Sequence, residues 1–227
     1  MDSATPDDPA APQVLSPALM LAAYRAGVFP MAESRAASDL FWVDPQWRGV
    51  FPLNGFHISA SLGRRMRRGG YSICLNHDFP EVVDACADRP ETWINTDLRR
   101  VYLGLASLGA AHSWEIRGPD GALWGGVFGV TLGRAFFGES MVSRATDGSK
   151  LALAHLVDHL RRCGFLLFDT QFLTPHLESL GAVEIARADY RAQLAVALEG
   201  TARITALPPD PDPVQVWQRM TQTSKRG

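Results

Sequence analysis

The sequence predicts an α+β fold built around a mainly antiparallel central sheet. The first observation is a Gly-Pro-Asp-Gly turn at 118–121 between two strand-like runs, 113–117 and 122–131, which is typical of a β-hairpin. The second is a Leu-Gly turn at 132–133 that leads into a third strand over 134–139. The third is that segments with helix start and stop signals flank these strands on both sides.

Ahead of the hairpin, four helices and one strand are expected. The first helix has Ser16 as its cap, Pro17 at its first position and Gly27 as its stop. Similar signals predict further helices over 59–68, 78–87 and 95–109, with a strand at 71–75.

The elements after the third strand also follow from local signals. A long helix is expected from Ser149 to Cys163, because Gly164 can stop it, and an apolar strand follows at 165–172. The remaining elements are a short helix over 174–181, a strand near 183–185 and a last helix from Asp189.

Composition divides the chain into four parts. Residues 1–13 are rich in Pro and Asp and predict a disordered tail. The aromatic, loop-rich stretch 14–55 is expected to form a small N-terminal domain, and 56–205 a larger second domain. Residues 206–227 predict a polar C-terminal tail, in which Trp217 is the apolar exception.

Length, charge and cysteine content exclude several classes. With 227 residues and 46% hydrophobic content, the chain can bury a real core. Three cysteines without a C-x-x-C spacing indicate neither a disulfide framework nor a Cys-rich zinc site. No secretory signal and no apolar run of membrane-spanning length is visible, so a cytoplasmic location is expected. The net charge of −2 argues weakly against nucleic-acid binding.

The strand at 165–172 carries the main candidate for chemistry. Alternation along a strand places Asp169 and Gln171 on one face and Phe168 on the other. A carboxylate beside an amide can orient an attacking group and stabilise a developing oxyanion. The alternative is a structural polar pair at a strand end. Glu139, which ends another apolar strand, could anchor Gln171 or a substrate hydroxyl.

Other motifs are less specific. Four arginines crowd residues 64–68 and predict either a phosphate-binding site or a solvated helix face. A serine nucleophile elbow at 138–142 is disfavoured, because Val142 occupies the position of the last glycine. His155 and His159 lack the H-E-x-x-H pattern, so no metal site is expected there.

Six short motifs, in order along most of the chain, resemble those of the leucyl/phenylalanyl-tRNA–protein transferase family of the bacterial N-end rule. They are YRAGVFP at 24–30, TWI at 92–94, AHS at 111–113, GESMVSR at 138–144, DTQ at 169–171 and SLGA at 179–182. The resemblance implies a small N-terminal domain followed by a GNAT-type N-acyltransferase domain. It also implies transfer of leucine or phenylalanine from tRNA to proteins that begin with Arg or Lys, without metal or cofactor.

The resemblance assigns roles residue by residue. Asp169 and Gln171 match the catalytic pair and Glu139 its supporting carboxylate. Tyr24 and Trp93 count among the substrate-binding residues, with Trp93 stacking on the terminal adenosine. The positions similar to those that line the amino-acid pocket are Val127, Phe136, Met141, Leu153, Leu156 and Phe168. The positions that match the basic cluster facing the tRNA acceptor stem are Arg64, Arg67 and Arg68.

The chain departs from the family pattern at three positions. Met31 replaces a usual Trp after Phe-Pro, Val142 replaces a common Phe, and Thr174 stands where relatives often carry Asn. The pattern does not rank leucine, phenylalanine and methionine as donors. It also does not identify the residues that read the acceptor, for which Glu139 is a weak candidate.

Two rival functions stay open at this point. One is a GNAT-type N-acetyltransferase, although the pyrophosphate loop of acetyl-CoA users is not recognisable near Arg144 and Gly148. The other is a non-catalytic module that binds tRNA or protein N-termini. Five acidic residues lie in the predicted tails, so a neutral total charge is compatible with one local basic patch. The expected partners are leucyl- or phenylalanyl-tRNA and the acceptor protein. The protein is expected to act as a monomer and not to bind a membrane.

Overall fold

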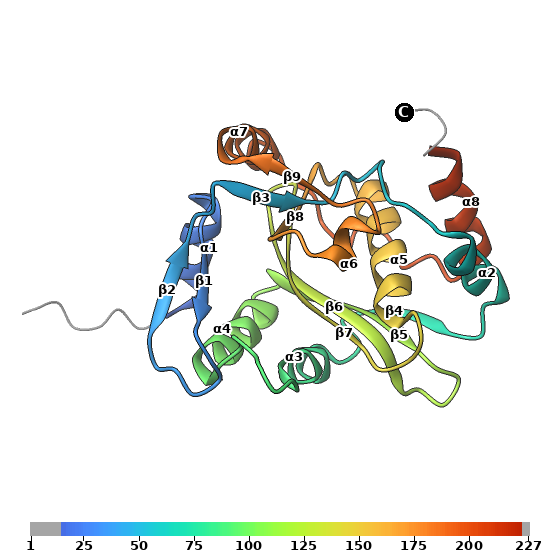
Figure 1. Ribbon diagram of the computed structural model, residues 1–227, viewed down its shortest axis with the longest axis horizontal. Coiled ribbons are helices and arrows are strands. Elements are labelled where there is room, and N and C mark those ends of the chain that lie inside the picture. The colour runs from blue at the N-terminus through green and yellow to red at the C-terminus, as the bar shows by residue number, and fades with distance from the viewer. Residues whose placement is uncertain (1–14, 224–227) are drawn as a thin grey trace, which may run out of the picture.

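A seven-stranded mixed sheet organises the chain in the computed structural model, which describes residues 15–223 (Figure 1). Its strand order is β4-β5-β6-β7-β8-β3-β9, and every neighbouring pair is antiparallel except the parallel pair β7 and β8. The predicted α+β class is therefore confirmed. The tail expected at 1–13 lies outside the described residues.

The sheet strands are β3 (Trp47–Val50), β4 (Ser72–Leu75), β5 (Ala111–Arg117), β6 (Leu123–Leu132), β7 (Ala135–Ser143), β8 (Leu167–Gln171) and β9 (Val183–Ala186). The helices are α1 (Pro17–Arg25), α2 (Ala60–Arg68), α3 (Phe79–Ala87), α4 (Thr96–Ser107), α5 (Gly148–Arg162), α6 (Pro175–Glu178), α7 (Arg187–Leu198) and α8 (Pro213–Thr223). A separate pair of strands consists of β1 (Phe29–Ala32) and β2 (Leu40–Val43).

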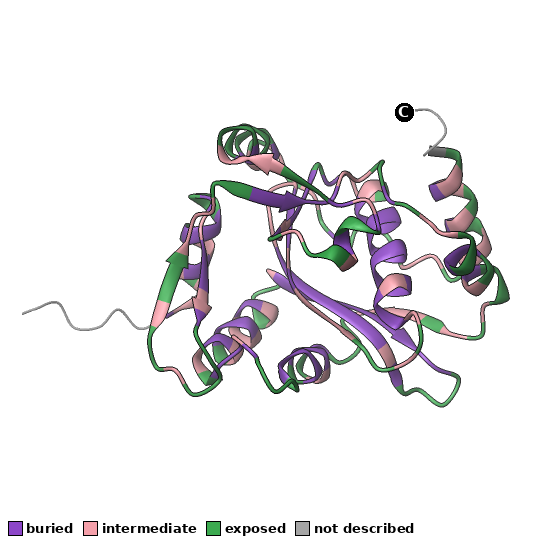
Figure 2. Cartoon of the chain, viewed as in Figure 1, coloured by how far each residue is buried: buried purple, intermediate pink, exposed green. Residues whose placement is uncertain are grey.

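Two hydrophobic clusters lie on opposite faces of this sheet. One joins α1, α3, α4 and α7 to residues such as Phe128 and Phe137. The other joins α2, α5, α6 and α8 to neighbouring strand residues such as Val127 and Phe136, which alternate with the first set. Figure 2 shows the buried residues concentrated in the central strands and α5. The strands β6 and β7 therefore contribute to both clusters.

Local capping explains where most helices begin. The side chains of Ser16, Ser59, Asp78, Asn95 and Thr174 each accept a hydrogen bond from the backbone N–H three residues later. These starts match the predicted ones. The predicted hairpin 113–131 corresponds to β5 and β6.

One glycine pair lets α5 begin directly against the sheet. A Cβ atom at Gly125 in β6 would lie 2.2 Å from the carbonyl carbon of Gly148, the first residue of α5. The close approach of the two backbones therefore requires glycine, as expected for glycines inside a strand.

The structure differs from the sequence-based expectation at both ends. The stretch 14–55 contains three strands, and one of them, β3, lies inside the main sheet between β8 and β9. The segment 206–227, expected as a polar tail, contains α8. This helix is amphipathic, because Val216 and Met220 are buried four residues apart, and it packs against α2 and α5.

Candidate active site

The candidate site lies where the parallel strands β7 and β8 separate. Only three residue pairs hold the two strands together, from Ala135 and Leu167 to Phe137 and Asp169. Beyond the last pair, both strands continue without pairing with each other, to Ser143 and Gln171 respectively. A small cavity of about 70 Å³ opens in this divergence.

Glu139 enters the site through a β-bulge. In the pairing of β6 with β7, Gly129 lies opposite Gly138 and Phe128 opposite Ser140, so Glu139 is the extra residue. A bulge changes the direction of the side chain that it carries. Glu139 is 8% exposed and also lines the cavity.

Three donors surround the Glu139 carboxylate. The hydroxyls of Tyr24 and Tyr102 donate hydrogen bonds of 2.6 Å to Oε1 and Oε2, and Gln171 Nε2 donates one of 3.0 Å to Oε2. Burial and the neighbouring carboxylate raise the pKa of both tyrosines, which stay protonated as donors. Burial also raises the pKa of Glu139, to about 7, although the three hydrogen bonds oppose this shift.

Asp169 is completely buried and fully hydrogen-bonded. Arg48 Nε donates to Oδ1 at 2.9 Å, Arg48 Nη2 donates to Oδ2 at 2.6 Å, and the Tyr190 hydroxyl donates to Oδ2 at 2.7 Å. The backbone N–H of Gln171 donates to Oδ1 at 2.8 Å. The Asp169 carboxylate therefore faces protein donors instead of the cavity.

This bonding sets the direction of the Gln171 side chain. Gln171 adopts a φ of 65°, which is uncommon for a residue other than glycine. The hydrogen bond from its N–H to Asp169 supports this turn, and its side chain then reaches Glu139. The structure thus brings the three predicted residues Glu139, Asp169 and Gln171 into one connected network.

Arg48 holds the network together, but the sequence did not predict this role, because it shows only an arginine within an aromatic segment. It is 1% exposed, donates to the Gly27 carbonyl, and lies between the rings of Phe29 and Tyr190 at 4.5 and 4.4 Å. Burial disfavours its charge, but the hydrogen bond to Asp169 and the attraction of Asp169 and other nearby acidic groups together outweigh burial and raise the pKa of Arg48.

The predicted amino-acid pocket corresponds in part to the cavity. Four of the six residues line it, namely Val127, Met141, Leu153 and Phe168. The other two, Phe136 and Leu156, are buried and do not line it; the Phe136 ring lies 5.1 Å from that of Phe168. Leu177 and Thr170 complete the wall, and the Thr170 hydroxyl is buried without a hydrogen-bond partner among the described residues.

The remaining predicted residues lie outside this cavity. Trp93 is half-buried with its ring edge-on to Tyr102 at 6.3 Å, and the Tyr102 hydroxyl in turn donates to Glu139. Arg64, Arg67 and Arg68 are exposed on α2, and Arg67 lies over the Trp217 ring at 4.6 Å.

The residues that depart from the family pattern have simple surroundings. Met31 is half-buried and pairs across β1 and β2 with the exposed Phe41, and Val142 is half-buried near the end of β7. Thr174 caps α6. The two helix histidines have structural partners, because His155 bonds to the Tyr71 hydroxyl and His159 to the Ile204 carbonyl.

Replacing Glu139 by glutamine should remove a pH dependence of stability. The folded chain holds the Glu139 proton more tightly than the unfolded chain, because its pKa is raised from 4.5 to about 7. The stability that this group contributes is present below about pH 4.5 and is lost as the pH rises through 7. From pH 5 to 8, the free energy of unfolding in urea should therefore fall more for the wild type than for Glu139→Gln. Parallel curves for the two proteins would contradict this prediction.

The chain is similar to proteins of one family over most of its length. Family models described as leucyl/phenylalanyl-tRNA protein transferase and its N-terminal domain match residues 50–195 and 13–46. Leucyl/phenylalanyl-tRNA–protein transferases from Cereibacter sphaeroides and Ruegeria pomeroyi are 60% and 62% identical, over 94% and 92% of this chain and 99% of each relative. The one from a Jannaschia species is 61% identical over 87% of this chain and 92% of its own.

The structure of L-PGS from Bacillus licheniformis matches 88% of this chain and 67% of the L-PGS chain. The TM-score is 0.38 and the sequence identity is 12%, so this similarity is too distant to define the fold. The family models, in contrast, match most of the sequence, including Tyr24, Tyr102, Glu139, Asp169 and Gln171, whereas Arg48 lies between the two matched ranges. The chain belongs to the leucyl/phenylalanyl-tRNA protein transferase family.

Proposed function

We propose that the protein transfers leucine or phenylalanine from aminoacyl-tRNA to the N-terminal α-amine of cytoplasmic proteins that begin with arginine or lysine. This transfer would mark the acceptor for N-end rule degradation. The observation that carries the proposal is Glu139, which lines an apolar cavity between two diverging strands and accepts a hydrogen bond from Gln171. The same divergence supports a GNAT-type N-acyltransferase fold.

The reaction needs little from the enzyme beyond positioning, because the donor ester is already activated. The acceptor amine attacks the ester carbonyl carbon, the bond to the tRNA ribose oxygen breaks, and that oxygen takes up the proton lost by the amine. An α-amine has an ordinary pKa of about 7.7–8.0, so a substantial fraction is neutral near pH 7.5.

Gln171 is the group we assign to the attacking amine. Its Nε2 is held by Glu139, so its Oε1 is free to accept a hydrogen bond from that amine. Asp169 acts as a positioning residue in this proposal, since its oxygens already accept hydrogen bonds from Arg48, Tyr190 and the Gln171 backbone. This differs from the expectation that Asp169 is itself one member of the catalytic pair.

The tRNA would be held mainly by charge. Exposed arginines on α2 can bind acceptor-stem phosphates, and Trp93 can stack on the terminal base. All groups of the network come from one chain, so we infer that a monomer is sufficient. Methionine is retained as a possible third donor, because apolar pockets discriminate weakly between side chains of similar size.

A competition between donors tests the proposal against acetyl-CoA chemistry. The purified chain is incubated with a peptide that begins with arginine, labelled leucyl-tRNA and an excess of unlabelled acetyl-CoA. We expect leucine on the peptide, no acetyl group and no inhibition. Acetylated peptide would instead favour the N-acetyltransferase, and binding of tRNA without any transfer would favour the non-catalytic module.

Narrowing the cavity should change the choice of donor. Leu153→Phe adds volume to the wall of a cavity of about 70 Å³, and such overpacking costs about 1–3 kcal/mol. We expect kcat/KM for phenylalanyl-tRNA to fall at least tenfold and to fall more than that for leucyl-tRNA. Leu166→Phe, at an exposed leucine, is the matched control and should change neither value. Equal losses with both donors would argue against this cavity as the amino-acid pocket.

A further inference from the structure

We propose that Arg144 binds a backbone phosphate of the single-stranded 3′ end of the donor tRNA. The inference rests on the proposed function and adds a binding site distinct from the arginines of α2. It is carried by the cavities beside the amino-acid pocket, by the charges in them and by the position of Arg144 next to that pocket.

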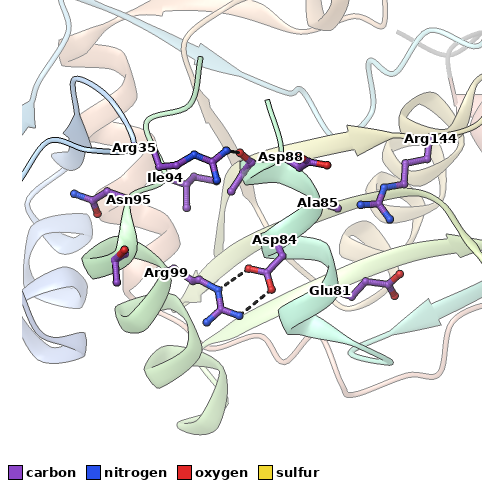
Figure 3. A pocket seen from close by; sticks show the side chains of 11 residues that line it. Arg35, Glu81, Asp84, Ala85, Asp88, Ile94, Asn95, Arg99 and Arg144 are labelled. Atoms are coloured by element: carbon purple, nitrogen blue, oxygen red, sulfur yellow. Dashed lines mark hydrogen bonds and ion pairs between the residues drawn. The ribbon is translucent and has the colours of Figure 1, made fainter. Parts of the chain in front are cut away.

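Two larger cavities, of about 480 and 530 Å³, follow the amino-acid pocket, and only the smaller of them adjoins it. The first shares Met141 with that pocket, and both share Ala85, Asp88 and Arg144 with each other. The three cavities therefore lie in a row from the Glu139 pocket, past the end of β7, to the start of α4, and the two larger ones form one hollow. Figure 3 shows the Arg144 side chain extending from the sheet side toward Ala85 on α3.

Positive charge is in excess along this hollow. Arg35, Arg89 and Arg144 form no ion pair with any described carboxylate. Arg35 and Arg89 instead donate to backbone carbonyls, which leaves their charges uncompensated. Of the three acidic residues along the hollow, Asp84 and Glu81 are neutralised by arginines, and Asp88 is not.

The charge favours the donor over the acceptor as the occupant. An acceptor that begins with arginine or lysine is cationic and would be repelled by uncompensated arginines, whereas single-stranded RNA carries one negative charge per nucleotide. Arginine also binds phosphate oxygens in a bidentate manner. Arg144 is exposed and its guanidinium has no hydrogen-bond partner among the described residues, so it is available for such a contact.

The location of Arg144 fits the path that the strand must follow. Its backbone N–H donates to the Trp124 carbonyl at 2.8 Å, and Arg65 of α2 lies 5.3 Å over the Trp124 ring. Arg144 is also only three residues beyond Met141, which lines the amino-acid pocket. Arg144 therefore lies close to the pocket where the aminoacyl group would lie, and its backbone bonds to the residue whose ring meets Arg65.

A series of shortened donors tests this site. Leucyl-tRNA, a leucyl trinucleotide with the 3′-terminal sequence and leucyl-adenosine without phosphate are compared as donors for the wild type and Arg144→Gln. We expect kcat/KM of the variant to fall at least fivefold with the first two donors and to stay within twofold with leucyl-adenosine. A plot of log affinity for the trinucleotide against log salt concentration should become less steep by about 0.7, as expected for the loss of one phosphate contact.

Two further variants separate this site from its neighbours. Arg64→Gln on α2 should weaken the binding of leucyl-tRNA but leave the binding of the trinucleotide unchanged. Asp88→Asn should strengthen the binding of the trinucleotide, because it removes a negative charge that repels the phosphate. The inference would be overturned if kcat/KM of Arg144→Gln fell equally with leucyl-adenosine, or if it did not fall with the leucyl trinucleotide.

Fluorescence anisotropy of a labelled trinucleotide that carries no amino acid measures binding, and this readout does not depend on transfer. If wild-type protein binds this probe more tightly than Arg144→Gln but transfers nothing from any donor, the phosphate site stands and the proposed function fails. If the wild type transfers leucine and both proteins bind the probe equally, the proposed function stands and the phosphate site fails.

Discussion

Gln171→Ala should lower kcat for leucine transfer by about 100- to 1,000-fold, the range seen when one preorganised polar group is removed from the reacting centre. The loss is expected because the side chain that lies against Glu139 is the one that would meet the acceptor amine. Binding of leucyl-tRNA, measured by filter retention, should change less than twofold, since the hydrogen bonds of Gln171 go to Asp169 and Glu139 and not to the basic helix α2.

The matched control is Gln193→Ala, at an exposed glutamine on α7, which should retain full activity. A Gln171→Ala enzyme with kcat within threefold of the wild type would remove Gln171 from the mechanism. The network around Glu139 would then be a structural polar cluster, which is the alternative that the sequence left open.

Arg48→Met should destabilise the fold by about 3–5 kcal/mol, the cost of removing one partner from a buried ion pair. The variant leaves the Asp169 carboxylate, which is 0% exposed, without its cationic partner. Urea unfolding at pH 7 measures the loss. Arg100→Met is the control, because Arg100 and Asp97 form an exposed pair of the kind that contributes at most about 1 kcal/mol.

A double variant separates stability from activity. Arg48→Met combined with Asp169→Leu replaces the ion pair by apolar groups and should recover much of the lost stability. It should not recover leucine transfer, because the Gln171 N–H loses the acceptor that supports its turn. Recovery of both properties would contradict the positioning role assigned to Asp169.

Local signals in the sequence were sufficient for most of the fold. Side-chain caps at Ser16, Ser59 and Asn95 mark helix starts, because they satisfy backbone N–H groups within the same turn. The hairpin of β5 and β6 is similarly local, since its turn chemistry lies between its strands.

The features that the sequence did not reveal depend on distant partners. Arg48 lies 121 residues before Asp169, and no local pattern shows that β3 lies beside β8. The same holds for Tyr102, whose hydroxyl meets Glu139 from another element. A β-bulge likewise appears only when two strands are paired, so the special position of Glu139 could not be read from one strand.

The charge of the chain illustrates the same limit. A net charge of −2 suggested little affinity for nucleic acid. The arrangement in space is different, because arginines without carboxylate partners gather in the cavities beside the amino-acid pocket, while two of their three acidic neighbours are paired with other arginines. Charge distribution, rather than the sum, governs how a surface meets phosphate.

The measurement that tests the central claim most directly is the position and identity of the new bond. A peptide that begins with arginine is incubated with leucyl-tRNA and either the wild type or Gln171→Ala, and the products are sequenced by tandem mass spectrometry. The account predicts one leucine joined to the N-terminal α-amine by the wild type and almost none by the variant. Leucine on a lysine side chain, or an unmodified peptide with folded wild-type protein, would contradict it.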